Sequence, residues 1–143
     1  MMVRRAQRED LPRIVEIERL CFPEEAAFPP KMFSYLLTYA EALVAYNGQV
    51  EGFVIGYTSG KMGLIYTLDV HPDYRRRGVG GVLMKSMEEV LASKGARILR
   101  LEAAVENPAA LALYLKAGFR KGSLIKDYYG LGKDAWRLIK ERS

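Results

Sequence analysis

The sequence predicts one mixed α+β domain over residues 1–143. Three observations support this fold class. Helical and strand patterns alternate along the chain, three strand patterns follow one another between residues 42 and 70, and a helical pattern at 79–94 separates two strand patterns that should pair in parallel. No repeat, low-complexity segment or linker divides the chain. We therefore expect a mostly antiparallel sheet of about seven strands with about four helices.

Capping and turn residues delimit the first elements. Residues 3–6 form a short strand pattern, and Asp10 and Pro12 mark the beginning of a helix, with Asp10 as its N-cap. A loop with three prolines occupies residues 21–30, and a short second helix is predicted over residues 32–37. The first quarter of the chain should therefore form an edge strand and two helices.

Three strands are predicted next, at residues 42–46, 50–58 and 64–70. Asn47-Gly48 joins the first two strands, and this dipeptide favours a type I′ hairpin turn. A glycine-containing turn at residues 59–63 joins the second strand to the third. The three strands should form an antiparallel meander.

The second half of the chain is predicted to alternate helices and strands. A helix over residues 79–94 has an apolar stripe and ends near Gly95, which is a suitable C-cap. Asn107-Pro108 begins the last helix. The remaining predicted features are a strand at 97–105, the end of the last helix at Gly118, and two closing antiparallel strands at 119–127 and 134–140.

The cysteine and histidine counts exclude several classes of protein. The chain has one cysteine, Cys21, and one histidine, His71. No disulfide can form within it, which is typical of a reducing compartment, and a structural zinc site would need about four ligands of these types. No apolar segment approaches the roughly 20 residues of a membrane span, and no apolar stretch follows the basic N-terminus as in a signal peptide. We expect a cytoplasmic protein without a metal or a membrane partner.

Positive charge is concentrated in the second half of the chain. Residues 1–60 contain six Lys or Arg and eight Asp or Glu, whereas residues 61–143 contain sixteen and nine, within a net charge of +5. A partner with clustered negative charge should therefore meet the second half. Nucleic acid and a phosphorylated cofactor are two such partners.

The segment Arg75-Arg76-Arg77-Gly78-Val79-Gly80-Gly81 lies between a predicted strand and a predicted helix. Successive backbone N–H groups at the start of a helix bind anions, and glycines allow a pyrophosphate to approach the backbone. The spacing matches neither a P-loop nor a dinucleotide fingerprint. From spacing alone, a phosphate-binding turn and a solvated basic loop are equally supported.

Three residues in the next strand and helix are candidates for acid–base chemistry or for structural roles. Glu102 lies near the end of a strand expected to be covered on both faces, where a carboxylate suits a general base. An ion pair with Arg97 or Arg100 explains Glu102 at least as well. Asn107 is a good helix N-cap. Tyr114 lies seven residues further on the same helix face and suits a core aromatic or a proton donor.

Taken together, these segments resemble the GCN5-related N-acetyltransferase (GNAT) family. Residues 75–80 fit the family's cofactor motif [QR]-x-x-G-x-[GA], and residues 68–74 are similar to its L-x-V-x-P-x-Y strand end. Residues 107–119 fit N-x-x-A-x-x-L-Y-x-x-x-G-F. The resemblance covers nearly the whole chain and implies the GNAT fold, in which two parallel strands splay apart at the cofactor site.

Within the family, the sequence most resembles the RimI/Ard-like protein N-terminal acetyltransferases. Cys21-Phe22-Pro23 lies in the loop after the first helix, Glu102 precedes Asn107 at that group's spacing, and Tyr128-Tyr129 stands where those enzymes have a tyrosine pair. The loop departs from the group in one respect, because residues 24–28 replace a tryptophan–serine pair often found there. In the family, that loop lines the acceptor site.

The resemblance implies acetyl-coenzyme A as the donor and no metal. The backbone of Leu68 and Val70 would hold the pantetheine and the acetyl carbonyl, and Asn107 and Tyr114 would also contact the cofactor. The pyrophosphate would bind the amides of the glycine-containing turn, which are those of Arg75, Arg76, Arg77, Gly78, Val79, Gly80 and Gly81.

The resemblance also implies direct attack of an amine on the thioester. Glu102 would accept a proton from the incoming ammonium, and Tyr114 would protonate the leaving thiolate. The implied acceptor site comprises Phe22, Glu24, Tyr128 and Tyr129.

The sequence leaves the acceptor open. The tyrosine pair and the Phe-Pro loop favour the α-amine of a protein N-terminus, whereas Glu24, Glu25 and Glu102 would suit a small amine such as a polyamine or an aminoglycoside. A nucleic-acid-binding module would rest on three clustered arginines alone and is disfavoured. The presence of both proton-transfer candidates, Glu102 and Tyr114, argues against a silent acetyl-coenzyme A sensor. A monomer and a homodimer both fit the sequence.

Overall fold

The computed structural model describes residues 1–24 and 26–142. The α-helices within these residues are Leu11–Cys21 (α1), Pro30–Tyr39 (α2), Val79–Ser93 (α3) and Pro108–Lys116 (α4). The strands are Met2–Arg5 (β1), Glu41–Tyr46 (β2), Val50–Ser59 (β3), Met62–Val70 (β4), Ile98–Ala104 (β5), Arg120–Ile125 (β6) and Ala135–Glu141 (β7). The predicted order of helices and strands is confirmed.

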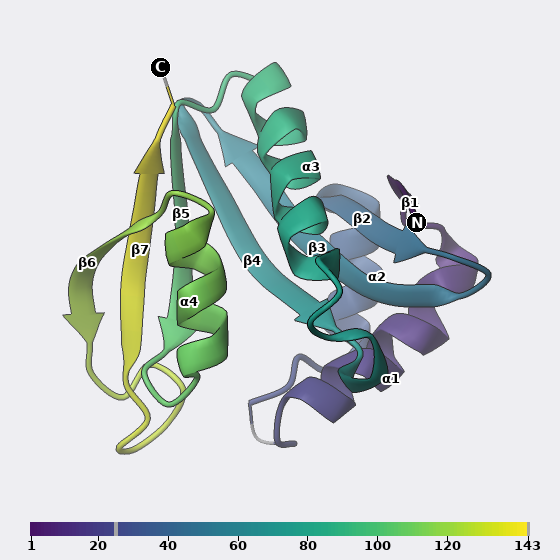
Figure 1. Ribbon diagram of the computed structural model, residues 1–143, viewed down its shortest axis with the longest axis horizontal. Coiled ribbons are helices and arrows are strands. Elements are labelled where there is room, and N and C mark those ends of the chain that lie inside the picture. The colour runs from purple at the N-terminus through teal and green to yellow at the C-terminus, as the bar shows by residue number, and fades with distance from the viewer. Residues whose placement is uncertain (25, 143) are drawn as a thin grey trace.

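The described strands form one seven-stranded sheet in the order β1-β2-β3-β4-β5-β7-β6. β4 and β5 are parallel and are connected through α3, as predicted, while the other neighbouring strands are antiparallel. The parallel register covers only Met62–Leu64 opposite Ile98–Arg100. Beyond it the two strands diverge, and we call this divergence the β4–β5 fork (Figure 1).

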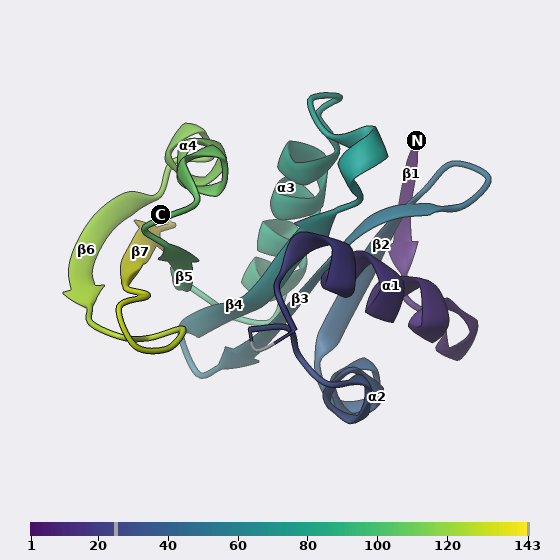
Figure 2. The same cartoon turned by 90° about the horizontal axis from the view of Figure 1, so that it is seen from below.

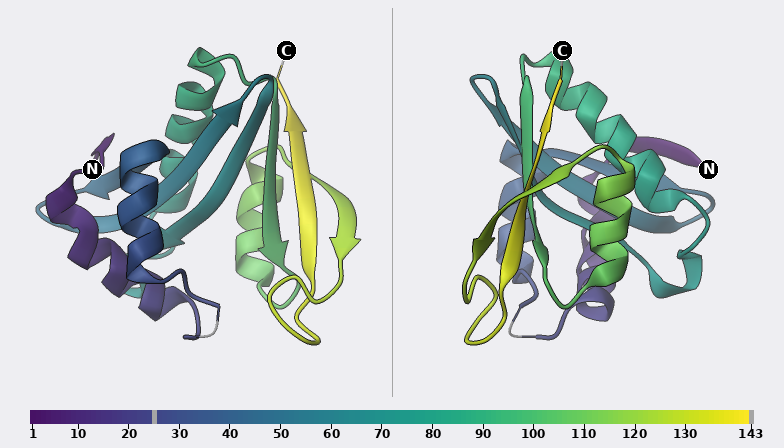
Figure 3. Two further views of the ribbon diagram at one scale, coloured as in Figure 1. Left: turned by 180° about the vertical axis from the view of Figure 1, so that it is seen from behind. Right: turned by 60° about the vertical axis from the view of Figure 1, so that its left-hand side comes forward.

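The helices lie on both faces of the sheet. Seen from below, α3 and α4 lie on one face and α1 and α2 on the other (Figure 2). α3 contacts β2, β3 and β4, whereas α4 contacts β5. From behind, β5, β7 and β6 present a face that no helix of the described residues covers (Figure 3). The expectation that helices cover both faces of β5 is therefore wrong.

Two hydrophobic clusters fill the two helix–sheet interfaces. The cluster under α3 and α4 includes Leu83, Met87, Leu91, Leu99, Leu101 and Leu138. The cluster under α1 and α2 includes Ile14, Ile17, Phe33, Phe53 and Ile55. Each fully buried side chain of this size stabilises the fold by roughly 1.5–3 kcal/mol, so both interfaces hold the sheet in place.

A β-bulge in β4 decides which residues face α1 and which face α3. Ile55 pairs with Thr67 and Gly56 with Ile65, so Tyr66 is the extra residue. Before the bulge, Ile65 belongs to the cluster under α3. An uninterrupted strand would place Asp69 on that same face. After the bulge, however, Leu68 and Val70 pack against this cluster and Asp69 faces α1.

The predicted type I′ turn between β2 and β3 is wrong. Tyr46 pairs with Val50, which leaves residues 47–49 as the loop. Gly48 has φ +80, but Asn47 has no positive φ, and a type I′ turn requires both. Beside the loop, the register shifts by one position, and Glu51 is the extra residue at the start of β3.

Asp10 is the N-cap residue of α1, as predicted, but its side chain makes no capping hydrogen bond to this helix. Its carboxylate accepts hydrogen bonds from the Gln7 N–H (2.7 Å) and from the Arg4 guanidinium (2.8 Å). These bonds fix a 3₁₀ turn at Arg8–Asp10 and connect it to β1. Asp10 can be buried because Arg4 of the edge strand β1 pairs with its carboxylate.

Replacing Gly52 with alanine should destabilise the fold beside the fork. A Cβ at this position would approach the Asp69 carbonyl to 2.7 Å and Leu83 to 3.2 Å. Overpacking costs about 1–3 kcal/mol, and urea unfolding should show a loss of that size. Gly81→Ala is the control, because a Cβ there meets nothing within 4 Å. Equal stability of Gly52→Ala and the wild type would contradict the close packing of β3, β4 and α3.

Candidate active site

The end of β4 presents backbone hydrogen-bonding groups to the β4–β5 fork. The His71 N–H donates to the Glu51 carbonyl (2.9 Å), so these two residues occupy a hydrogen-bonded position of the β3–β4 ladder. Bonded and non-bonded pairs alternate along an antiparallel ladder. The N–H and C=O groups of Leu68 and Val70 therefore point away from β3, toward the fork. This edge can bind an extended amide-containing chain as an added strand would.

The N-terminus of α3 offers unpaired amides beside open space. Gly78 has φ +82, and no side chain of the described residues caps the helix. The first helical hydrogen bond runs from the Val82 N–H to the Gly78 carbonyl (3.1 Å), so the N–H groups of Val79, Gly80 and Gly81 precede it. A Cβ at Gly78 or Gly81 would meet no atom within 4 Å. The turn therefore has the donors and the room that a pyrophosphate needs.

The arginines before this turn have different surroundings. Arg75 donates from Nε to the Val70 carbonyl (3.2 Å) and from Nη2 to the Cys21 sulfur (3.3 Å). Arg77 lies over the Tyr74 ring, 5.6 Å from its centre. The Arg75 guanidinium thus faces the end of α1, which the sequence did not suggest.

Glu102 lies two residues beyond the last β4–β5 pair and is the centre of a polar cluster. Its Oε2 accepts a hydrogen bond from Arg137 Nε (3.0 Å) and lies 3.5 Å from Arg100 Nε. Its Oε1 accepts the Tyr128 hydroxyl (3.3 Å), and its backbone carbonyl accepts the Tyr129 hydroxyl (3.3 Å). The structure therefore joins the predicted base to the predicted tyrosine pair.

Tyr114 is buried in α4, with its ring against that of Phe119. Burial, with smaller contributions from the charges of Asp69 and Tyr129, raises the pKa of Tyr114 above its usual value. Burial likewise raises the pKa of Tyr129. Tyr114 is therefore a protonated phenol at neutral pH.

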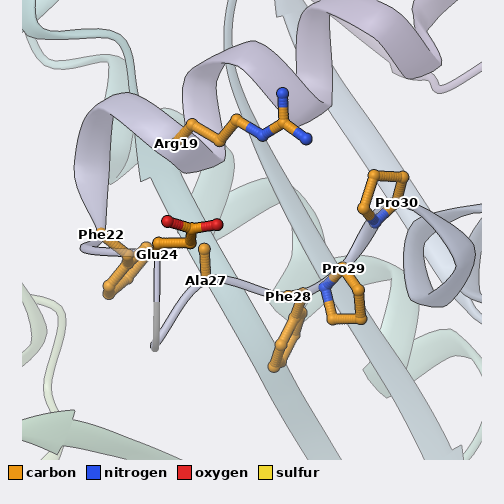
Figure 4. A pocket seen from close by; sticks show the side chains of 7 residues that line it. All are labelled: Arg19, Phe22, Glu24, Ala27, Phe28, Pro29 and Pro30. Atoms are coloured by element: carbon orange, nitrogen blue, oxygen red, sulfur yellow. The ribbon is translucent and has the colours of Figure 1, made fainter.

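The loop between α1 and α2 encloses a pocket of about 680 Å³ (Figure 4). Phe22 and Glu24, two of the residues predicted to bind the acceptor, line it together with Phe28 from the same loop and Arg19 from α1. Tyr128 and Tyr129 do not line this pocket; they lie at Glu102. Glu25, which was considered as part of an acidic pocket, lies outside the described residues.

Comparison with known proteins identifies the family. Residues 11–119 match the acetyltransferase (GNAT) family. The chain belongs to the GNAT family of N-acetyltransferases. It is 32% identical to an N-alpha-acetyltransferase of Sulfurisphaera tokodaii, over 95% of this chain and 90% of that protein.

Two solved structures show the same fold as this GNAT chain. The ribosomal-protein-S18-alanine N-acetyltransferase from Escherichia coli has a TM-score of 0.86 and 26% identity, over 99% of this chain and 94% of that one. An aminoglycoside 6′-N-acetyltransferase complexed with coenzyme A has a TM-score of 0.85 and 16% identity, over 99% and 97% of the two chains. The second likeness concerns the fold alone.

The GNAT structure gives Asn107 a structural role and adds a partner to Glu102. Asn107 Oδ1 accepts the Ala110 N–H (3.1 Å), so this side chain caps α4. Of the two arginines expected near Glu102, Arg100 is a neighbour, whereas Arg97 donates to the Ala96 carbonyl. Arg137 was missed, although pairing of β5 with β7 places it directly opposite Glu102.

Within residues 1–24 and 26–142, no group of three or more His, Cys, Asp or Glu side chains is arranged to hold a metal ion. In the same part of this acetyltransferase, no helix has the length and apolar character needed to cross a membrane.

Proposed function

We propose that this acetyltransferase transfers the acetyl group of acetyl-coenzyme A to the α-amine of a protein N-terminus, by direct attack in a ternary complex. The observation that carries the proposal is the cluster in which Glu102 binds both Tyr128 and Tyr129 beside the β4–β5 fork. A cytoplasmic location fits the single thiol, Cys21, which burial keeps protonated by raising its pKa to about 11.

Two features of the backbone support acetyl-coenzyme A as the donor. The outward-facing N–H and C=O groups of Leu68 and the N–H group of Val70 match the peptide-like pantetheine arm, while the Val70 carbonyl accepts a hydrogen bond from Arg75. The amides of Val79, Gly80 and Gly81 match the pyrophosphate. Arg76 and Arg77 add positive charge next to this turn. The donor supplies an activated thioester carbonyl when it is bound, and the chain supplies the groups that hold it.

Proton transfer is assigned to Glu102 and Tyr114. An α-amine with a pKa of about 8 is largely protonated at pH 7, so a base must remove its proton before attack. Glu102 Oε2 is bound to Arg137, whereas Oε1 accepts only the Tyr128 hydroxyl among the described groups, so Oε1 is the atom assigned to take the proton, directly or through water. The buried phenol of Tyr114 then donates a proton to the leaving thiolate.

Similarity to two enzymes supports a protein N-terminus as the acceptor. The relatives above are named for N-alpha acetylation and for acetylation of a ribosomal-protein alanine. The pocket of the α1–α2 loop supports a second candidate, a small polyamine or aminoglycoside, because Glu24 lines it, but Arg19 in the same lining opposes a cationic ligand. A simple assay distinguishes these two classes of acceptor.

Thiol release from acetyl-coenzyme A should be measured with a panel of short peptides and with spermidine. We expect turnover on peptides that have a free α-amine and none on the same peptides after their α-amine is blocked. Turnover on spermidine alone would replace the protein acceptor with a small amine. The absence of turnover on either class would contradict the proposal.

Tyr114→Phe should lower kcat while leaving the affinity for acetyl-coenzyme A nearly unchanged. The ring remains in the core, but the proton donor is lost, and acid–base assistance of this kind is worth about 10²–10⁴-fold. Steady-state kinetics and calorimetric titration with coenzyme A measure the two effects. Tyr39→Phe, at an exposed tyrosine of α2, is the matched control and should behave as the wild type. An unchanged kcat would remove Tyr114 from the mechanism.

Glu102→Gln should move the pH–rate profile toward higher pH. Without the carboxylate, the amine has to lose its proton to bulk water, so activity should follow the amine's own pKa of about 8. The rate at fixed, subsaturating acceptor is measured from pH 6 to pH 10. Glu141→Gln is the control, because Glu141 pairs with Arg120 at the far end of β7. A profile identical to that of the wild type would rule out Glu102 as the base.

A further inference from the structure

Two carboxyl groups are buried against each other between α1 and β4, outside the residues assigned to catalysis. Glu18 of α1 and Asp69 of β4 are each 2% exposed. α1 packs on β4, and Glu18 is close enough to Asp69 to raise the pKa of the Asp69 carboxyl. Among the described residues, no N–H or O–H group reaches Glu18 Oε1 or Asp69 Oδ2. Each carboxyl group therefore has one oxygen that lacks a donor in the interior.

The other two oxygens have partners of different kinds. Asp69 Oδ1 accepts the Thr67 hydroxyl (2.8 Å), within β4. Glu18 Oε2 accepts a hydrogen bond from the N–H of Phe28 (2.8 Å), a residue of the α1–α2 loop. Phe28 lines the loop pocket and packs on Phe33, with ring centres 5.8 Å apart. Glu18 thus fixes the loop that forms the pocket.

Among residues 1–24 and 26–142, no lysine or arginine forms an ion pair with either carboxyl group. The charged and titratable groups that face it are Cys21 at the end of α1, Arg75 after β4 and Tyr114 of α4. Arg75 places its N–H groups on the Val70 carbonyl and on the Cys21 sulfur, and its influence on Asp69 is a weak attraction at a distance. Two ionised carboxylates in contact would repel strongly in such a buried place.

We propose that Glu18 and Asp69 share one proton and that this acid pair positions the α1–α2 loop on β4. One proton between Glu18 Oε1 and Asp69 Oδ2 supplies the missing donor for both oxygens and removes the repulsion. The pair then connects the loop to the strand whose neighbouring residues, Leu68 and Val70, face the fork. Its effect on the acceptor rests on the proposed function, whereas the shared proton does not.

The sign of the pH dependence follows from the direction of the pKa shift. Burial, the Glu18 hydrogen bond and the Glu18 charge raise the pKa of Asp69 well above its ordinary value of 3.8. The folded protein therefore retains a proton that the unfolded chain releases as the pH rises through about 4. Between the unfolded and the folded pKa, folding takes up a proton, so this stabilisation decreases as the pH rises.

Thermal unfolding of the wild type, Asp69→Asn and Glu18→Gln at pH 5 and pH 9 tests the shared proton. Either amide can donate an N–H to the opposite oxygen without taking up a proton. Relative to the wild type, each variant should gain about 4 °C or more between pH 5 and pH 9. Glu16→Gln, at an exposed carboxyl of α1 that pairs with Arg13, is the control and should keep a constant difference.

A constant difference for both buried variants would overturn the shared proton. Infrared spectroscopy of the wild type provides a measurement that does not depend on any variant folding. At pH 7 we expect the C=O stretch of a protonated carboxyl, shifted when aspartate and glutamate carry a ¹³C carboxyl. The absence of this band would also overturn the proposal.

The positioning effect is tested by kinetics. Glu18→Ala should raise the KM for the acceptor about tenfold and leave the KM for acetyl-coenzyme A unchanged, because it releases the Phe28 N–H. Glu18→Gln retains an oxygen for that N–H and should restore the wild-type value. An unchanged acceptor KM in Glu18→Ala would overturn the positioning role. Failure of all acetylation would refute the proposed function but leave the unfolding and infrared results valid.

Discussion

The interrupted pairing of β4 with β5 is the constraint on which the rest of the molecule depends. A continuous parallel ladder would bind the backbone groups of both strands, but here it ends at Leu64 and Arg100. The strand ends beyond this point have hydrogen-bonding groups that require partners from outside the sheet. The beginning of α3, the helix α4 and the loop between β6 and β7 all lie around this unpaired edge. The proposed acetyl transfer uses backbone groups that the interrupted β4–β5 pairing leaves available.

Contacts outside the fork connect its two arms, which are β4 with its helix α3 and β5 with its helix α4. Lys140 of β7 binds Glu88 of α3 (2.9 Å) and the Ala117 carbonyl at the end of α4 (2.7 Å). This one ammonium joins the helix packed on β3 and β4 to the helix packed on β5. Because it lies on the α3 and α4 side, it restrains the angle between the arms without occupying the fork. Backbone groups can therefore remain unpaired there within an otherwise rigid sheet.

The elements of the fold were predictable because their signals are local, whereas contacts between distant residues were not. Helical spacing, Asn107 as a cap and glycine at Gly118 each depend on a few neighbouring residues, and the motifs placed Glu102 and Tyr114 correctly on β5 and α4. The approach of Glu18 to Asp69 depends on the packing of α1 on β4, and Arg137 meets Glu102 only through strand register. The Asn47-Gly48 signal failed because Tyr46 pairs with Val50, which makes Gln49 a third loop residue.

The bulge at Tyr66 limits which insertions and deletions β4 can accept during evolution. The extra residue shifts the alternation of side chains by one position, so residues after the bulge face the side opposite to the one that regular alternation from Ile65 would give. Loss of Tyr66 itself would restore regular pairing and leave these faces unchanged, whereas loss of Thr67 with the bulge retained would turn Asp69 toward α3 and turn Leu68 and Val70 toward α1. The backbone edge and the acid pair would be lost together. Insertions and deletions should therefore be tolerated in the loops on either side of β4 far more readily than within it.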